Sequence, residues 1–242
     1  MSAATLIFDC DGVLVDSETI AEATLLRQLA DLLPDIPRDV ALRQALGMTT
    51  ASILAHLEGQ SAHRLPDDAL SRIDDAIEAR LAEEVCAIEG VVETVAGLRL
   101  PLAIVSNSRR RRVVASLATT GLDAWLSEVP LFTAEQVQRP KPAPDLYLLA
   151  ARSLGCAPHD CLVVEDSVSG VTAAHAAGMT VIGFTGASHI EDGHAERLSR
   201  AGAWQVLPSM HGLAALIDRW QEERQRRVTS PQAASAGKRS LR

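Results

Sequence analysis

The stretch LIFDCDGVLVDSE, residues 6–18, carries the strongest fold signal in this sequence. Its apolar start, Leu6-Ile7-Phe8, predicts a buried strand that ends at the carboxylates of Asp9 and Asp11. The two aspartates share a face if the strand continues, although a turn at Gly12 could swing Asp11 off that line. We expect both carboxylates in one small volume, where their repulsion favours a divalent cation such as Mg²⁺. A strand followed by an ordinary polar turn is the alternative.

Composition restricts the class of protein. The 242 residues suffice for one large domain or for a core with an insertion, and 47% of them are hydrophobic. A formal net charge of -8 and only 3% aromatic residues argue against a nucleic-acid partner. No basic segment precedes an apolar stretch near the N-terminus, and no apolar run reaches membrane-spanning length, so we expect no membrane contact and a cytoplasmic location.

The cysteines give no sign of a disulfide framework or a zinc site. They form no CxxC pair and no zinc-type spacing. We expect all four to be buried thiols in a reducing compartment. They are Cys10, Cys86, Cys156 and Cys161.

The chain between the first motif and Cys86 predicts helices only. Apolar residues recur at helical spacing over residues 18–33, 38–57 and 67–85, and no strand pattern appears. We therefore expect a small helical cap over residues 18–86, inserted into a core formed by residues 1–17 and 87–227. Such an insertion is either a separate small domain or a lid.

From Gly90 the pattern changes to an α/β alternation. β-rich runs at 102–105, 129–132, 161–164, 180–183 and 203–207 alternate with helical stretches at 109–118, 145–154, 168–177 and 211–224. This alternation predicts a parallel sheet with helices on both faces, whose ligands bind beyond the carboxyl ends of the strands. Residues 228–242 lack a periodic apolar pattern and predict a disordered tail, with a basic binding arm as the alternative.

A polar motif follows the predicted strand at 102–105. Ser106-Asn107-Ser108 stands at the start of a helix, where such side chains often cap free N–H groups. Alternatively, the helix N-terminus and the Ser106 hydroxyl hold a phosphate. The arginines that follow, residues 109–112, spread around the helix, so we expect at most one of them to reach a substrate.

Lys141 stands in the segment RPKPAPD, residues 139–145. Three prolines restrict this backbone, and Lys141 is its one long cation, so a phosphoryl oxygen suits it better than solvent alone. Asp145 can cap the helix that follows.

A second acidic pair, Glu165-Asp166, follows the predicted strand at 161–164. With Asp9 and Asp11 it would complete a carboxylate cluster of the hard oxygen ligands that Mg²⁺ prefers. Capping of the next helix explains Ser167 but not the two acidic residues together.

The four motifs together resemble those of the haloacid dehalogenase-like (HAD) hydrolase superfamily. Asp9-x-Asp11-Gly12, Ser106-Asn107, Lys141 and Glu165-Asp166 occur in that order, each after an apolar run. The resemblance covers roughly residues 4–220. It implies a Rossmann-like core, and the helical insertion resembles the cap of the subgroup that holds β-phosphoglucomutase-like and 6-phosphogluconate phosphatase-like proteins.

The resemblance also implies a role for each motif residue. Asp9 would be the nucleophile that forms an aspartyl phosphate, and Asp11 the general acid and then the base. Substrate phosphate and metal would be held by two different groups of residues. Ser106, Asn107 and Lys141 would bind the phosphate, and Mg²⁺ would be held by Asp9, the Asp11 carbonyl and Asp166, with Glu165 near it.

By this resemblance, the protein is expected to be a phosphatase for a small phosphorylated sugar, polyol or sugar acid, and a monomer or weak homo-oligomer. Asp11 argues against a dehalogenase, and no lysine precedes Lys141 to serve as a phosphonatase Schiff base. A phosphosugar mutase remains an alternative, as does a non-catalytic protein that binds or senses a phosphometabolite. The cap residues expected to meet an anionic end of the substrate are Arg43, His56, His63 and Arg64.

Overall fold

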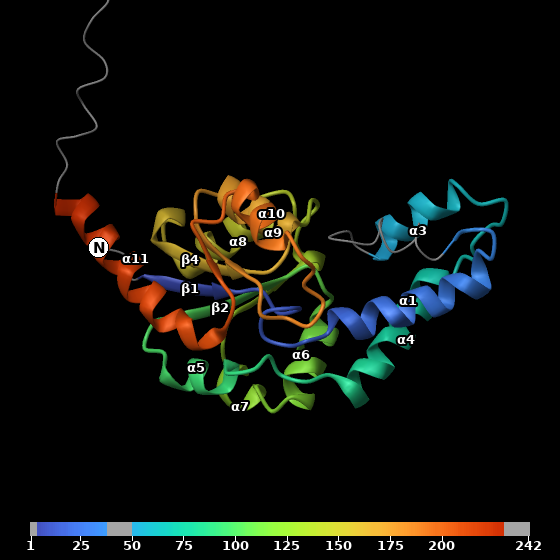
Figure 1. The fold of residues 1–242 in the computed structure, drawn as a ribbon, viewed down its shortest axis with the longest axis horizontal. Helices are drawn as coiled ribbons and strands as arrows, with labels where there is room; N and C mark the ends of the chain where they lie inside the picture. The colour runs from blue at the N-terminus through green and yellow to red at the C-terminus, as the bar shows by residue number, and fades with distance from the viewer. Residues whose placement is uncertain (1–3, 38–49, 230–242) are drawn as a thin grey trace, which may run out of the picture.

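The structure, a computed structural model, describes residues 4–37 and 50–229 and contains a six-stranded parallel sheet (Figure 1). The strand order is β3-β2-β1-β4-β5-β6, which confirms the predicted α/β, Rossmann-like core. The strands are β1 (Thr5–Phe8), β2 (Leu102–Ser106), β3 (Leu131–Thr133), β4 (Cys161–Glu165), β5 (Thr180–Phe184) and β6 (Gln205–Leu207).

The strand order places a crevice beside β1. The chain runs from β1 through β2 to β3 on one side, and then crosses to β4, β5 and β6 on the other. In such sheets, the carboxyl ends of the strands beside the reversal form the ligand site. Phe8 at the end of β1 pairs with Ile104 of β2 and Val164 of β4, so the residues that follow these three lie together.

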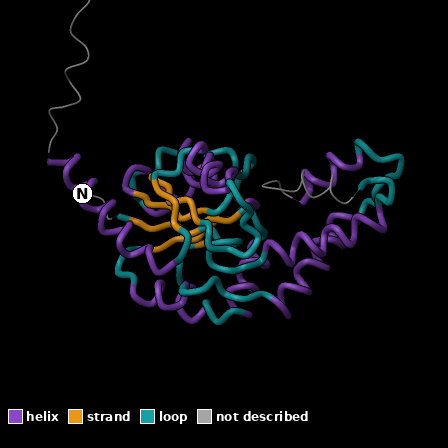
Figure 2. Tube along the Cα trace, in the orientation of Figure 1, coloured by secondary structure: helices purple, strands orange, loops and turns teal. Residues whose placement is uncertain are grey.

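Helices cover both faces of the sheet, as Figure 2 shows. Leu6 and Phe8 pack against α5, α6, α7 and α11, whereas Ile7 packs on the opposite face with α8, α9 and α10. Burial on both faces explains why β1 is a continuous apolar run. The helices on the two faces are α5 (Val91–Gly97), α6 (Arg110–Thr119), α7 (Asp123–Leu126), α8 (Asp145–Leu154), α9 (Val168–Ala176), α10 (His194–Ala201) and α11 (Leu213–Thr229), with short 3₁₀ turns at Ala134–Gln136, Pro158–Asp160 and Met210–Gly212.

The inserted helices lie to one side of the sheet (Figure 1). They are α1 (Glu18–Leu32), α3 (Thr50–Glu58) and α4 (Ala69–Glu84). Leu25 and Leu29 of α1 and Ile77 of α4 are buried in one apolar cluster. The predicted helix at 38–57 is described only from Thr50, and Arg43 lies outside the described residues.

Several elements differ from the sequence predictions. Helices α5, α7 and α10 were not predicted, because α5 and α7 are short and α10 is strongly charged with only Leu198 buried. The β-rich run at 129–132 pairs only from Leu131. Helix α11 continues to Thr229, beyond the predicted start of the tail, and the rest of that tail lies outside the described residues. The cysteines are free, and Cys10 and Cys161 are buried as expected, but Cys86 is exposed and Cys156 is only partly buried.

None of the helices within residues 4–37 and 50–229 combines the length and the apolar character needed to cross a membrane.

Candidate active site

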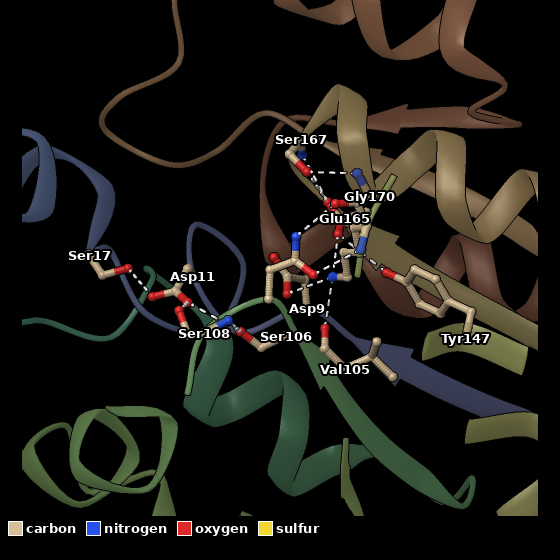
Figure 3. Close-up of polar contacts among 12 residues, drawn as sticks. Asp9, Asp11, Ser17, Val105, Ser106, Ser108, Tyr147, Glu165, Ser167 and Gly170 are labelled. Atoms are coloured by element: carbon tan, nitrogen blue, oxygen red, sulfur yellow. Dashed lines mark hydrogen bonds and ion pairs between the residues drawn. The ribbon is translucent and has the colours of Figure 1, made fainter. Parts of the chain in front are cut away.

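Polar residues, among them Asp9, Ser106 and Glu165, gather where β1, β2 and β4 end (Figure 3). Lys141 binds two of the carboxylates in this group. Its Nζ donates to Asp9 Oδ1 at 2.9 Å, to Glu165 Oε1 at 2.6 Å and to the Val105 carbonyl at 2.8 Å. Burial alone would lower the pKa of Lys141, but the charges of Asp9 and Glu165 raise it well above its usual value. The ammonium is therefore a permanent buried cation.

Asn107 clamps the backbone of Lys141. Its Nδ2 donates to the Lys141 carbonyl at 3.1 Å, and its Oδ1 accepts from the Lys141 N–H at 3.0 Å. Both ends of the amide that we expected to bind phosphate are thus engaged with the protein. Asp145, expected to cap α8, instead forms an ion pair with Arg139 at 2.7 Å.

Glu165 is fully buried at the end of β4 and is surrounded by donors. The Ser167 N–H and hydroxyl both donate to its Oε2 at 2.9 Å, and the Tyr147 hydroxyl donates to its Oε1 at 3.3 Å. Ser167 also caps α9, as predicted, by accepting from the Gly170 N–H at 2.9 Å. A Cβ at Gly170 would lie 1.6 Å from Glu165 Oε1, so only glycine fits there.

Asp9, Glu165 and Asp166 form an acidic cluster whose candidate ligand atoms all lie within 4.8 Å of one another. Burial raises the pKa of Asp9 well above its usual value, and the charges of Glu165 and Asp166 add to this effect although Lys141 opposes it. The single positive charge of the Lys141 ammonium therefore does not neutralise the three carboxylates of the cluster. Three crowded carboxylates match the donor set and charge that Mg²⁺ prefers, so these residues fit such an ion.

His189, which sequence reasoning missed, contacts this cluster. Its Nε2 lies 3.2 Å from Asp166 Oδ2. Burial would lower the pKa of His189, but its hydrogen bond with Asp166 and the charge of that carboxylate raise it. Gly12 makes room for this pair, since a Cβ there would lie 1.8 Å from Asp166 Oδ2. His189 stands in a loop after β5, where no periodic pattern marks it.

Asp11 belongs to a second polar network, apart from Lys141 (Figure 3). Its Oδ1 accepts from the Ser17 hydroxyl at 2.6 Å and from Arg112 Nη2 at 3.1 Å, and its Oδ2 accepts from the Ser108 hydroxyl at 2.6 Å. The Ser106 hydroxyl lies 3.3 Å from the same Oδ2. The carboxylates of Asp9 and Asp11 thus have different hydrogen-bond partners, although the charge of Asp11 still contributes to the raised pKa of Asp9.

The surroundings of Asp11 favour its ionised form. Burial would raise its pKa, but the Arg112 charge and the hydrogen bonds from Ser108 and Ser17 outweigh that effect and lower it. The opposite holds for Glu18 at the start of α1. Burial and the charge of Asp11 raise the pKa of Glu18 to about 7, although Arg112 opposes this shift.

Arg112 is the one arginine of the run 109–112 that contacts Asp11 within the described part of the chain. Arg109 pairs with Asp74 at 3.0 Å, and Arg111 pairs with Glu78 at 2.7 Å, both on α4. The cap residues suggested from the sequence do not join the site. His56, His63 and Arg64 are exposed on α3 and the loop after it, which lies away from the sheet (Figure 1).

Comparison with known proteins identifies the family. Residues 6–184 match the family described as haloacid dehalogenase-like hydrolase. Hexitol phosphatase A from Escherichia coli (strain K12) is 34% identical over 199 residues, covering 75% of this chain and 83% of that protein. The 6-phosphogluconate phosphatase of the same organism is 27% identical over 185 residues, covering 76% of this chain and 83% of that protein.

A solved structure agrees with these matches. A HAD family hydrolase from Deinococcus radiodurans R1, with bound phosphate and sodium, has a TM-score of 0.71 and 36% identity, covering 90% of this chain and 96% of that one. The chain therefore belongs to the haloacid dehalogenase-like hydrolase family. The prediction of a HAD-like enzyme whose relatives include phosphatases is confirmed.

We expect Gly170→Ala to destabilise the protein. Alanine normally favours a helix over glycine by up to about 1 kcal/mol. Here the added methyl group collides with buried Glu165. Overpacking should therefore lower the free energy of unfolding by about 1–3 kcal/mol, measured by urea denaturation.

The neighbouring Ser169→Ala variant is the matched control for this collision. The Ser169 hydroxyl is buried without a partner among the described residues, and its removal adds no atom. We expect its free energy of unfolding to stay within about 0.5 kcal/mol of the native value. Stabilisation by Gly170→Ala would show that Glu165 is free to move.

Proposed function

We propose that the protein is a Mg²⁺-dependent phosphatase that hydrolyses a small phosphorylated sugar, polyol or sugar acid through an aspartyl phosphate on Asp9. The observation that carries this proposal is the buried arrangement of Asp9 between the Lys141 ammonium and the carboxylates of Glu165 and Asp166. A carboxylate can approach an anionic phosphate monoester only where positive charge offsets the repulsion. This arrangement provides one cation and a site for a second.

The metal would be held by Asp9, Asp166 and the Asp11 backbone carbonyl, with Glu165 beside it. When bound, Mg²⁺ supplies positive charge for the phosphoryl oxygens and for the nucleophile. Glu165 also holds Lys141. Loss of Glu165 would therefore disturb both sources of positive charge.

The residues of this chain would divide the two chemical steps between them. In the first step, an Asp9 oxygen attacks phosphorus while Lys141 and the Ser106 hydroxyl hold phosphoryl oxygens. Asp11, whose pKa is lowered in the free protein, would take up a proton when the anionic substrate binds beside it and would give that proton to the departing alkoxide. In the second, Asp11 takes a proton from the water that attacks phosphorus, which frees Asp9 and inorganic phosphate. Asn107 contributes by fixing the Lys141 backbone.

The substrate class is supported by the relatives. Hexitol phosphatase A and 6-phosphogluconate phosphatase are named for a phosphorylated polyol and a phosphorylated sugar acid. The similar hydrolase from Deinococcus radiodurans R1 was solved with bound phosphate. No described residue of α3 reaches the site to favour one of these substrates over the other.

Phosphate release from a panel of phosphorylated metabolites tests the proposal. The panel includes 6-phosphogluconate, glucitol 6-phosphate and β-glucose 1-phosphate, each with Mg²⁺. We expect release from at least one alkyl phosphate and none with Asp9→Asn, which removes the nucleophile. Conversion of β-glucose 1-phosphate to glucose 6-phosphate without release would show a mutase, and inertness throughout would favour a binding protein.

Replacement of the general acid should slow turnover without unfolding the protein. We expect Asp11→Asn to lower kcat for an alkyl phosphate by at least ~10²-fold, because the amide cannot protonate the leaving oxygen. The asparagine oxygen can still accept from Ser17 and Arg112, and its amide nitrogen can donate to the Ser108 hydroxyl, so the melting temperature serves as the control for folding. Unchanged kcat would exclude Asp11 from proton transfer.

Binding of Mg²⁺ should stabilise the fold. After treatment with a chelator, addition of Mg²⁺ at about 100 times its Kd should add about 2.7 kcal/mol of stability, which a thermal melt detects. Asp166→Asn should abolish most of this shift because it removes a ligand. Asp75→Asn, which changes a half-exposed carboxylate on α4, should retain it. Equal shifts in both variants would place the ion elsewhere.

A further inference from the structure

The side chain of Arg112 contacts Asp11 but has no role in the reaction proposed above. It lies in the first turn of α6, and only 16% of its side chain is exposed. A guanidinium that is withdrawn from water needs a counter-charge nearby. In this structure that counter-charge is Asp11, whose Oδ1 lies 3.1 Å from Arg112 Nη2.

The guanidinium of Arg112 binds only one of the two carboxylate oxygens of Asp11. A guanidinium commonly grips a carboxylate through two parallel hydrogen bonds, which occupy both carboxylate oxygens. Here Arg112 bonds one oxygen through Nη2 alone, and its buried Nε has no partner among the described residues. Oδ2 of Asp11 is therefore left to the hydroxyls of Ser108 and Ser106, on the side of β2.

Within the part of the chain that the structure describes, Arg112 is also the only charged donor to Asp11. The other donors are the hydroxyls of Ser17, Ser108 and Ser106, each neutral and able to rotate. Charge-assisted hydrogen bonds are roughly twice as strong as neutral ones. All four bonds to the ionised Asp11 carboxylate are charge-assisted, and the bond from Arg112 adds the attraction between two opposite charges in a buried site.

We propose that Arg112 is a positioning residue that holds the Asp11 carboxylate where it serves the leaving-group oxygen. This assignment rests on the proposed function, in which Asp11 transfers a proton to that oxygen. Arg112 acts through Asp11 and not through Asp9, because its described contacts do not include the Lys141 network. Its loss should therefore slow substrates that need a proton on the leaving oxygen more than substrates that do not.

Leaving-group dependence tests this assignment. First-turnover rates are measured for p-nitrophenyl phosphate, whose phenolate departs without a proton, and for the faster of 6-phosphogluconate and glucitol 6-phosphate. For Arg112→Met, we expect the ratio of the alkyl rate to the aryl rate to fall by ~10²-fold, the size of a lost general acid, with KM changed less than about threefold. Arg112→Lys, which keeps a charged donor, should recover at least about tenfold of this ratio.

Two further variants distinguish a positioning role of Arg112 from a structural or substrate-binding role. Arg111→Met, in the same turn but paired with α4, should leave the ratio unchanged. Asp11→Asn should lower the ratio as Arg112→Met does, and its failure to do so would count against the proposed role of Asp11. Equal loss for both substrates in Arg112→Met would show a purely structural role, and a change in KM alone would show substrate binding; either overturns the assignment.

The folding of each variant and the activity of the native protein are measured as controls. Melting temperatures are recorded for every variant, and Arg112→Gln carries the same test if Arg112→Met does not fold. A native protein that hydrolyses none of the three substrates overturns the proposed function, and this assignment with it.

Discussion

The ammonium of Lys141 between Asp9 and Glu165 is the interaction on which the site depends. All three side chains are buried, and an unpaired charge in such surroundings would cost several kcal/mol. Removal of Lys141 would leave both carboxylates without their cation, and removal of either carboxylate would leave Lys141 paired with the other alone. Two neighbouring residues support these three side chains. Asn107 fixes the lysine backbone, and the absence of a Cβ at Gly170 leaves space for Glu165.

The sheet explains how residues so distant in sequence meet. Asp9 directly follows β1, and Glu165 ends the adjacent β4, because the crossover brings β4 back beside the first strand. Lys141 enters from the segment before α8 and bonds the Val105 carbonyl at the end of β2. Asp9 and Glu165 thus rest on strands whose apolar runs are buried on both faces, and Lys141 is held to the end of a third strand by its bond to Val105.

Sequence reasoning located the strands and the motifs that follow them, because burial on two faces leaves long apolar runs and because polar residues then stand out at the strand ends. It could not select Arg112 from four consecutive arginines, since that choice depends on which side of α6 faces Asp11. His189 was missed because a loop has no period. The hydrogen-bond partners that distinguish Asp11 from Asp9, the hydroxyls of Ser17 and Ser108, are revealed only by the fold.

The two aspartates of the first motif have different supports, and this difference follows from α6. Asp9 is tied to the sheet, whereas Asp11 is tied to Arg112 and to Ser17 beside α1. The same turn of α6 holds α4 through ion pairs that are individually weak because they are largely exposed. Any displacement of α4 or α1 would therefore reach Asp11 before it reaches Asp9. In the proposed reaction, the nucleophile Asp9 would therefore be held by the sheet, whereas the proton donor Asp11 would be held by contacts with α6 and with Ser17 beside α1. The placement of the proton donor would then depend on these helices more than the placement of the nucleophile does.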